Sequence, residues 1–175
     1  MISKVMEDAL NKQIQLEAYA SFLYLSMASW CDKESLNGCS AFMHRQSDEE
    51  RQHMLRIFHY ISEVGGHAIT PEVKQPPLAF DSVQNMFEQV YAHEQKVTAS
   101  IHKLVEMSKK EEDFTTLNFL QWYITEQREE ESLMRSILDK IKLIGVGPMS
   151  LYYIDKEIQE INTSEMAAES GENMA

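Results

Sequence analysis

Four long segments of the sequence repeat apolar residues at the spacing of an α-helix, and this repetition constrains the fold more than any other feature. The segments cover residues 4–30, 36–64, 82–109 and 114–144. The first and second are joined by only a few residues, as are the third and fourth, which predicts antiparallel neighbours. Residues 65–81 form a connection long enough to return along a whole helix, so the second and third helices can run parallel. We therefore expect an all-α protein, a four-helix bundle with one long crossover connection.

A fifth, shorter helix is expected over residues 149–161, after the helix-breaking residues 145–148. Its apolar stripe consists of Leu151, Ile154, Ile158 and Ile161. A closed four-helix bundle leaves this stripe without a partner, so we expect the helix to serve as an assembly contact. Residues 162–175 are small, polar and acidic, and we expect them to form a disordered tail beyond a domain of residues 1–161.

The acidic composition of the chain bears on its partners and location. A formal net charge of -12 argues against nucleic acid or an anionic membrane surface, because both require a basic face. The most apolar stretch, residues 18–30, is too short to span a bilayer. The first residues do not resemble a secretion signal, and Cys31 and Cys39 form neither a CxxC pair nor a disulfide framework. We expect a cytoplasmic protein with reduced thiols.

A polar residue interrupts the apolar stripe near the middle of each long helix. The interrupting residues are Glu17, Glu50, Glu94 and Gln127. Apolar residues seven or eleven positions away on the same helices lie within about 20° of them, so the polar residues face the core. His53 and Glu130 follow three positions after Glu50 and Gln127 and share their faces. Because all lie near the helix midpoints, we expect them to converge at one height in the bundle.

Such a layer of buried carboxylates requires compensating cations. One glutamate on an apolar stripe is more often paired or misaligned than functional, but here four stripes meet at one level and none carries a lysine or arginine. Four carboxylates and one imidazole suit two divalent ions of octahedral preference better than structural zinc, with a central glutamate able to bridge them. A Glu-x-x-His turn combined with inward glutamates from other helices is typical of di-iron bundles.

Several local sequences resemble those of the bacterial non-haem ferritins, and the resemblance extends from residue 1 to about residue 162. The matching runs are DEERQH at residues 48–53, NFLQWY at 118–123 with the acidic residues that follow it, and LYYIDKE at 151–157. The resemblance implies a ferritin-like fold and a ferroxidase that oxidises Fe(II) with O2 or peroxide. It further implies that Fe(III) oxide is deposited inside a shell of 24 subunits. No haem is expected, because Arg51 and Gln127 depart from the pattern of haem-carrying relatives.

The resemblance also implies a role for each residue of the core layer. Glu17, Glu50 and His53 would hold the first iron, and Glu50, Glu94 and Glu130 would hold the second. Gln127 would lie beside the second iron, either as a weak ligand or as a residue that contacts one of its ligands. Glu50, as the bridge, would be the central residue of the reaction.

Further residues match positions near the centre of these ferritins. Glu49, Glu126 and Glu129 match a third iron position, although the sequence alone is equally compatible with a solvated acidic face. Tyr24 and Trp122 match aromatic residues that can supply an electron, and ordinary core packing is an equal alternative for both.

Two other functions are compatible with the same residues. One is a di-iron oxidase or oxygenase that acts on an organic substrate, and the other is a metal-free helical interaction module whose core acids are protonated or networked. The fifth helix argues against the first alternative, since it makes sense as a shell contact. Iron content and particle size of the purified protein distinguish all three.

Overall fold

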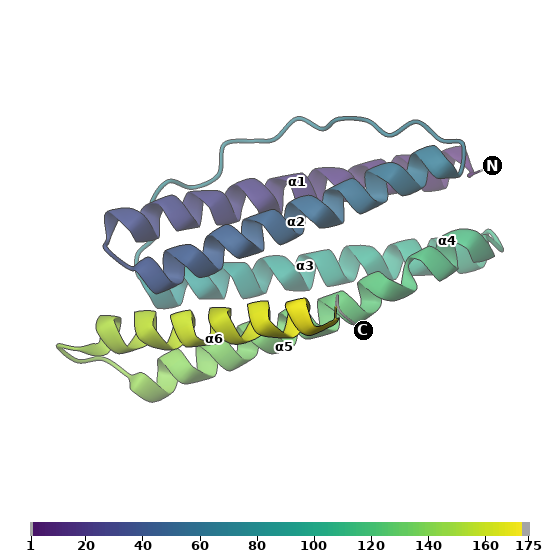
Figure 1. Cartoon of the computed structure of the whole chain (residues 1–175). Coiled ribbons are helices and arrows are strands. Elements are labelled where there is room, and N and C mark those ends of the chain that lie inside the picture. Colours follow the sequence, from purple (N-terminus) through teal and green to yellow (C-terminus); the bar gives the residue numbers. More distant parts are fainter. Residues whose placement is uncertain (1, 173–175) are drawn as a thin grey trace.

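The computed structural model describes residues 2–172, and all regular structure in this range is helical. The helices are α1 (Lys4–Lys33), α2 (Asn37–Glu63), α3 (Val83–Lys110), α4 (Phe114–Phe119), α5 (Gln121–Ile144) and α6 (Ser150–Glu172). In Figure 1, α1, α2, α3 and the α4–α5 pair lie along one another, and the connection from α2 to α3 passes over the length of the bundle. The predicted four-helix bundle with one long crossover is confirmed. Within the described residues, no helix is long and apolar enough to cross a membrane.

The crossover connection has no helical hydrogen bonds of its own and is held by polar side chains of α1. Asn11 accepts a hydrogen bond from the backbone N–H of Ile69 (2.8 Å), and Ser26 donates one to the carbonyl of Pro77 (2.6 Å). Gln15 makes a third such bond between them. Because these bonds are spread along about half of α1, they hold the connection against that helix, and its course along the bundle lets α3 run parallel to α2.

The hydrophobic core is divided along the bundle axis into two clusters. One includes Tyr24, Met27, Phe42, Phe87 and Met134, and the other includes Met6, Leu10, Ile57, Ile101 and Leu120. Each long helix contributes to both clusters. The buried glutamates and glutamines of the four helices lie between them. The core is therefore apolar at both ends of the bundle and polar in the middle.

The predicted fourth helix is two helices, α4 and α5, which meet at Leu120. The side-chain amide of Gln121 donates a hydrogen bond to the carbonyl of Leu117 (3.0 Å). In a continuous α-helix that carbonyl would accept from the backbone N–H of Gln121, so the side chain competes with the helix. The sequence prediction of one uninterrupted helix missed this local competition.

Helix α6 is longer than the sequence predicted and packs on its own chain. It continues to Glu172, so residues 162–172 are helical where a disordered tail was expected, while residues 173–175 lie outside the described residues. Ile154 and Ile158 are buried against α2 and α5, and Asn162 is buried as well. The prediction that this apolar stripe has no partner in the bundle was wrong at these positions, because α6 packs in the groove between α2 and α5.

Asp155 of α6 caps the N-terminus of α2, because the residue that precedes α2 provides no capping side chain. Leu36, which precedes α2, has no side-chain acceptor, and the backbone N–H of Cys39 donates instead to Asp155 Oδ1 (2.8 Å). A carboxylate at a helix N-terminus is favourable because it faces unpaired N–H groups. The two helices approach so closely that a Cβ on Gly38 would lie 2.2 Å from the carbonyl oxygen of Asp155.

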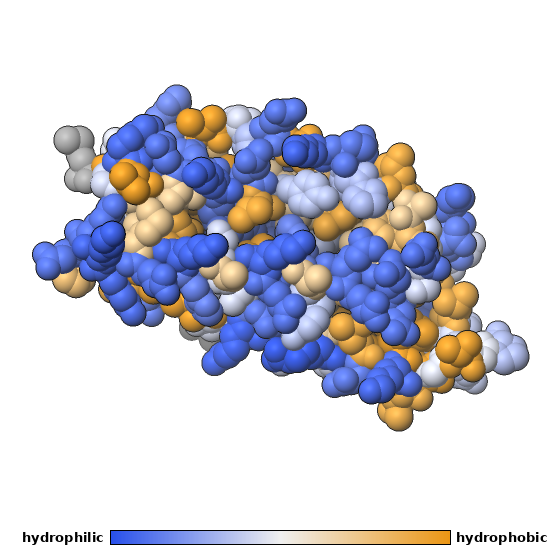
Figure 2. All heavy atoms as spheres, turned by 180° about the vertical axis from the view of Figure 1, so that it is seen from behind, coloured by the Kyte–Doolittle hydropathy of each residue, from blue (hydrophilic) through white to orange (hydrophobic). Residues whose placement is uncertain are grey.

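Large apolar side chains remain exposed at the corner where α5 turns into α6. They are Leu143, Val146, Met149, Leu151, Tyr152 and Tyr153, which we call the apolar corner. Figure 2 shows hydrophobic surface gathered at this end of the molecule, at the lower right, on a face that is otherwise mostly hydrophilic. An exposed patch of this kind is typical of a protein–protein contact.

We predict that Gly38→Ala destabilises the protein, although alanine is the better helix former by about 1 kcal/mol. The added methyl group must push α6 away from α2, at a cost of about 1–3 kcal/mol. Gly147→Ala is the matched control, because a Cβ there meets only the Ser150 hydroxyl at 3.6 Å. Thermal unfolding and hydrogen exchange of α6 measure the effect. Equal stability of the two variants would contradict the close contact.

Candidate metal centre

The polar layer of the core brings together side chains from all four helices of the bundle. Glu17 comes from α1, Glu50 and His53 from α2, Glu94 from α3, and Gln127 and Glu130 from α5. None of them is more than 6% exposed. The structure therefore places every residue of the predicted two-iron site in one buried layer.

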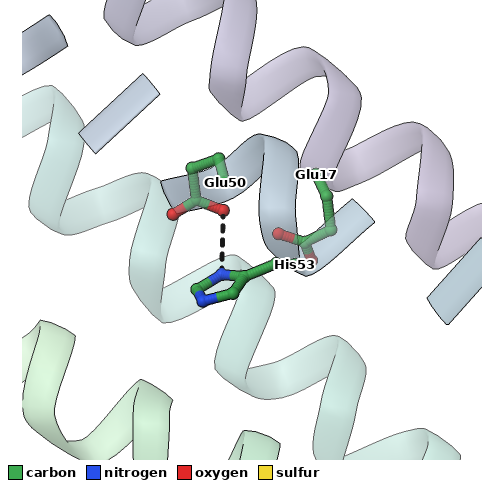
Figure 3. A group of neighbouring side chains, drawn as sticks. All are labelled: Glu17, Glu50 and His53. Atoms are coloured by element: carbon green, nitrogen blue, oxygen red, sulfur yellow. Dashed lines mark ion pairs between the residues drawn. The ribbon is translucent and has the colours of Figure 1, made fainter. Parts of the chain in front are cut away.

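Glu17, Glu50 and His53 form the tightest group in this layer. Each offers a ligand atom that lies within 4.8 Å of those of the other two. Figure 3 shows Glu50 and His53 projecting from the same helix, with Glu17 approaching from α1. His53 Nδ1 is 3.5 Å from Glu50 Oε2. One ion placed among these atoms could be bound by all three residues.

Hydrogen bonds orient two of the carboxylates. The Tyr24 hydroxyl donates to Glu94 Oε1, and Gln127 Nε2 donates to Glu94 Oε2 (3.0 Å). Gln13, a turn before Glu17, donates to Glu17 Oε1. Gln127 thus holds Glu94 in this structure, which is one of the two roles that the resemblance implied.

The sequence analysis missed Gln13, which is fully buried. The sequence could have predicted that Gln13 lies beside Glu17, because a residue four positions before Glu17 lies on the same helix face. His93 was missed too. Its ring lies 6.2 Å from that of Tyr24 and 5.9 Å from that of Tyr19, between centroids.

Burial makes ionisation of the clustered carboxylates unfavourable. Burial, followed by the charges of neighbouring carboxylates, raises the pKa of Glu50 and that of Glu130 well above the ordinary value. Burial also raises the pKa of Glu94 to about 7, although the hydrogen bonds from Tyr24 and Gln127 oppose the rise. Burial lowers the pKa of His53 and so favours the neutral imidazole, the form that binds metal ions.

Several buried atoms of the layer have lone pairs without a hydrogen-bond partner. They are Glu17 Oε2, Glu130 Oε2 and His53 Nδ1. Over the described part of the chain, no lysine or arginine forms an ion pair with the glutamates of the layer. Arg45 lowers the pKa of Glu130, but burial and the neighbouring carboxylates outweigh its effect. Unpaired oxygen and nitrogen atoms with so little compensating positive charge are the donor set of divalent metal ions. The residues present therefore fit bound divalent cations, with Glu17, Glu50 and His53 as the group whose ligand atoms lie close together.

The predicted third position is only partly assembled. Glu49 and Glu126 each bring a carboxylate oxygen within 4.8 Å of the other and of a His53 nitrogen. The side chain of Glu129 is 62% exposed and pairs with Arg128 (2.9 Å). All three glutamates, with Glu130, border one pocket next to the core layer.

Aromatic rings adjoin the layer on the side of His53. Trp122 lies 5.5 Å from His53 between ring centroids, and it is stacked on Tyr123. The guanidinium of Arg56 lies 3.9 Å from the centroid of the Trp122 ring. Tyr24, by contrast, is fully buried and contacts the layer through its hydroxyl. Both aromatics predicted near the centre are thus beside it.

Comparisons with known proteins agree with this architecture. Residues 7–144 match the family model of the ferritin-like domain. The chain is 47% identical to the bacterial non-haem ferritin of Campylobacter jejuni, over 94% of this chain and 98% of that one. It is 39% identical to that of Escherichia coli O157:H7, over 93% and 99% of the two chains. An open pore ferritin from Archaeoglobus fulgidus superposes with a TM-score of 0.87 at 47% identity, covering 90% of this chain and 96% of that one.

The raised carboxyl pKa values predict that the metal-free protein loses stability as the pH rises. At a pH below about 4.5, Glu94 is protonated in both the folded and the unfolded chain. Between that value and about 7 the unfolded chain releases the proton while the folded chain retains it. The stabilisation due to the retained proton is therefore lost as the pH rises through this window.

Glu94→Gln should remove this contribution, because the amide does not titrate. Urea unfolding of the metal-free parent and variant at about pH 5 and about pH 8 measures it. The variant should gain stability relative to the parent at the higher pH. A difference between the two proteins that does not change with pH would contradict the burial of an ionisable Glu94.

Proposed function

The chain belongs to the ferritin family, and from this membership and the buried carboxylate layer we propose that it stores iron and oxidises Fe(II) at a two-iron centre inside each subunit. The observation that carries the proposal is the convergence of Glu17, Glu50 and His53 in a buried layer whose glutamates form no ion pair with a lysine or arginine among the described residues. Iron is both substrate and stored product in this function.

In the proposed reaction, Glu17, Glu50 and His53 bind the first Fe(II), and Glu50, Glu94 and Glu130 bind the second. Two Fe(II) ions give up one electron each, and O2 takes up the two electrons with two protons to leave as hydrogen peroxide. Peroxide as the oxidant would take up two electrons and two protons and leave as water. The chain contributes by holding both ions at a fixed separation through Glu50. One oxidant molecule can then accept one electron from each ion.

Tyr24 and Gln127 act on the second iron through Glu94 in this proposal. Their hydrogen bonds fix the orientation of the Glu94 carboxylate, and the oxidisable Tyr24 ring is in direct contact with that group. We assign Tyr24 the role of an electron source when a single iron has reacted. Glu49, Glu126 and Glu129 receive iron from the centre at the third position.

The assembly that we propose is a shell of 24 copies of this chain that encloses the Fe(III) oxide. The relatives are ferritins, and the apolar corner offers surface for contacts between copies. The formal net charge of -12 favours cations near the protein surface, which assists iron entry and mineral formation.

The pocket beside the centre favours iron over an organic substrate. Five glutamates contribute to its lining: Glu49, Glu126, Glu129, Glu130 and Glu165. Sites for organic substrates are mostly lined by apolar and aromatic side chains. The lining of this pocket therefore argues against an oxygenase with an organic substrate.

We predict that Glu50→Leu abolishes rapid Fe(II) oxidation, because both ions lose a ligand and their common bridge. The metal-free variant should unfold at or above the parent temperature, since replacing a buried ionisable group by an apolar one of similar volume is often neutral or stabilising by about 1–4 kcal/mol. Added Zn(II) should stabilise the parent much more than the variant, because the stabilisation requires binding.

Stopped-flow oxidation and anaerobic thermal unfolding, with and without Zn(II), test this prediction. Glu88→Leu, at an exposed position of α3, is the matched control and should behave like the parent. A metal-free Glu50→Leu protein that is strongly destabilised would instead mean that Glu50 is a structural group. Purified protein that lacks iron and large particles after expression with iron would contradict the storage function itself.

We predict a different effect for Glu129→Ala, because this side chain stands at the edge of the pocket and outside the core layer. The first rapid oxidation should persist, while the oxygen consumed per iron or the rate of later turnovers should change. Oxygen-electrode measurements over successive additions of Fe(II) detect this. Complete loss of the first oxidation would place Glu129 in the two-iron centre and contradict the assignment of Glu130.

A further inference from the structure

We propose that Arg56 suppresses the oxidation of Trp122, so that Tyr24 rather than Trp122 loses an electron when only one Fe(II) reacts. Arg56 thereby determines which aromatic side chain beside the centre is oxidised. The inference rests on the proposed function, because that function supplies the oxidising reaction. The ease with which Trp122 is oxidised can nevertheless be measured in the metal-free protein.

Trp122 lies where an oxidising reaction at the centre can reach it. The centroid of its ring is 5.5 Å from that of His53, a proposed ligand of the first iron, and 4.3 Å from that of Tyr123, on which it is stacked. Among aromatic side chains, indole and phenol rings lose an electron most readily. Trp122 therefore competes with Tyr24 as the electron source, unless its surroundings oppose the loss of an electron.

The guanidinium of Arg56 opposes that loss. Its central carbon lies 3.9 Å from the centroid of the Trp122 ring, which is a cation–π contact. The contact stabilises the neutral ring, because the positive charge faces the electron-rich π system. When the ring loses an electron, the attraction becomes a repulsion between two positive groups. Among the described residues no carboxylate pairs with Arg56, so no direct partner neutralises its charge.

The proton of the indole ring has no acceptor, which opposes oxidation as well. An oxidised indole is a strong acid and is stabilised when its Nε1 proton leaves. Trp122 Nε1 is buried and has no hydrogen-bond partner within the described part of the chain. The hydroxyl of Tyr24, by contrast, donates to Glu94 Oε1, so its proton has an acceptor. The charge of Arg56 and the missing acceptor thus both favour Tyr24 over Trp122.

Electron loss from Tyr24 balances the reaction of a single iron. Fe(II) gives up one electron and becomes Fe(III), and Tyr24 gives up one electron together with its phenolic proton. O2 takes up both electrons, the proton from Tyr24 and one further proton from solvent, and leaves as hydrogen peroxide. An Fe(II) that arrives later returns one electron to the tyrosyl radical, and a proton from solvent restores the hydroxyl.

Arg56 could also act on Trp122 by covering the ring, and two variants separate its charge from its cover. Arg56 is exposed, and its apolar stem shields part of any surface on which it lies. Arg56→Met leaves an apolar chain of similar reach over the ring but removes the charge. Arg56→Lys retains the charge. The inference predicts that Arg56→Lys resembles the parent and that Arg56→Met does not.

Oxidation of the metal-free protein by a limiting amount of azide radical, generated by pulse radiolysis, tests the effect without iron. This oxidant is uncharged, so Arg56 does not alter its approach. Peptide mass spectrometry then gives the oxidised fraction of Trp122 relative to Trp30, the other tryptophan of the chain. Arg56→Met should raise this ratio by about tenfold, the effect expected of a charge about 4 Å away. Arg51→Met is the matched control, because it removes the same charge from another exposed position of α2.

The reaction with iron provides a second readout. After one Fe(II) per subunit has reacted with O2, electron paramagnetic resonance of the parent should show a tyrosyl radical that is absent from Tyr24→Phe. Arg56→Met should add a tryptophan radical and accumulate oxidised Trp122 over successive additions of Fe(II).

Several results would overturn the inference. They are equal oxidation of Trp122 in the parent and Arg56→Met, an equal rise in Arg56→Lys or Arg51→Met, and a parent in which iron oxidises Trp122 in preference to Tyr24. A metal-free protein that shows the expected charge effect but fails to oxidise Fe(II) would support the inference and contradict the proposed function.

Discussion

The structure depends on a layer of carboxyl groups buried between two hydrophobic clusters. Burying the carboxyl groups costs free energy, and burying the apolar clusters supplies it. Apolar side chains at both ends of the bundle supply the free energy of folding and hold the four helices in register. The layer itself opposes folding in the absence of metal, as the raised pKa values of Glu50, Glu94 and Glu130 show. Because the surrounding clusters fix the backbone, the carboxylates cannot separate to relieve their repulsion. The fold thereby keeps these candidate metal ligands in place in the metal-free protein.

The arrangement of the four long helices could be predicted because it follows from local features of the sequence. Helical periodicity gave the apolar faces, and the lengths of the connections gave the directions. The heights of Glu17, Glu50, Glu94 and Glu130 followed from their places near the helix midpoints, so their common layer could be expected as well. Binding of iron by this layer is a prediction that follows from its chemistry and from the family.

Contacts between side chains distant in the sequence could not be predicted in the same way. The docking of α6 requires Gly38 and Asp155 to meet across more than a hundred residues, and Arg45 and Asn162 likewise. Neither pair has a local signal, and the polar sequence after Ile161 resembled a tail. The role of Gln13 depends on the rotamer of its amide, which periodicity does not specify. Sequence patterns thus predicted which faces are buried, while hydrogen-bond partners required the structure.

The two ends of helix α6 lie in surroundings of different chemical character. Its first turn belongs to the apolar corner, and its second half lies over the pocket of glutamates. Asp155 and Ile158, between these ends, attach the helix to α2 and to the core. If the apolar corner contacts neighbouring copies in the proposed shell, assembly restrains the start of α6. Because Asp155 and Ile158 dock the same helix on the bundle, assembly should favour the docked position of α6 through the equilibrium between docked and undocked helix.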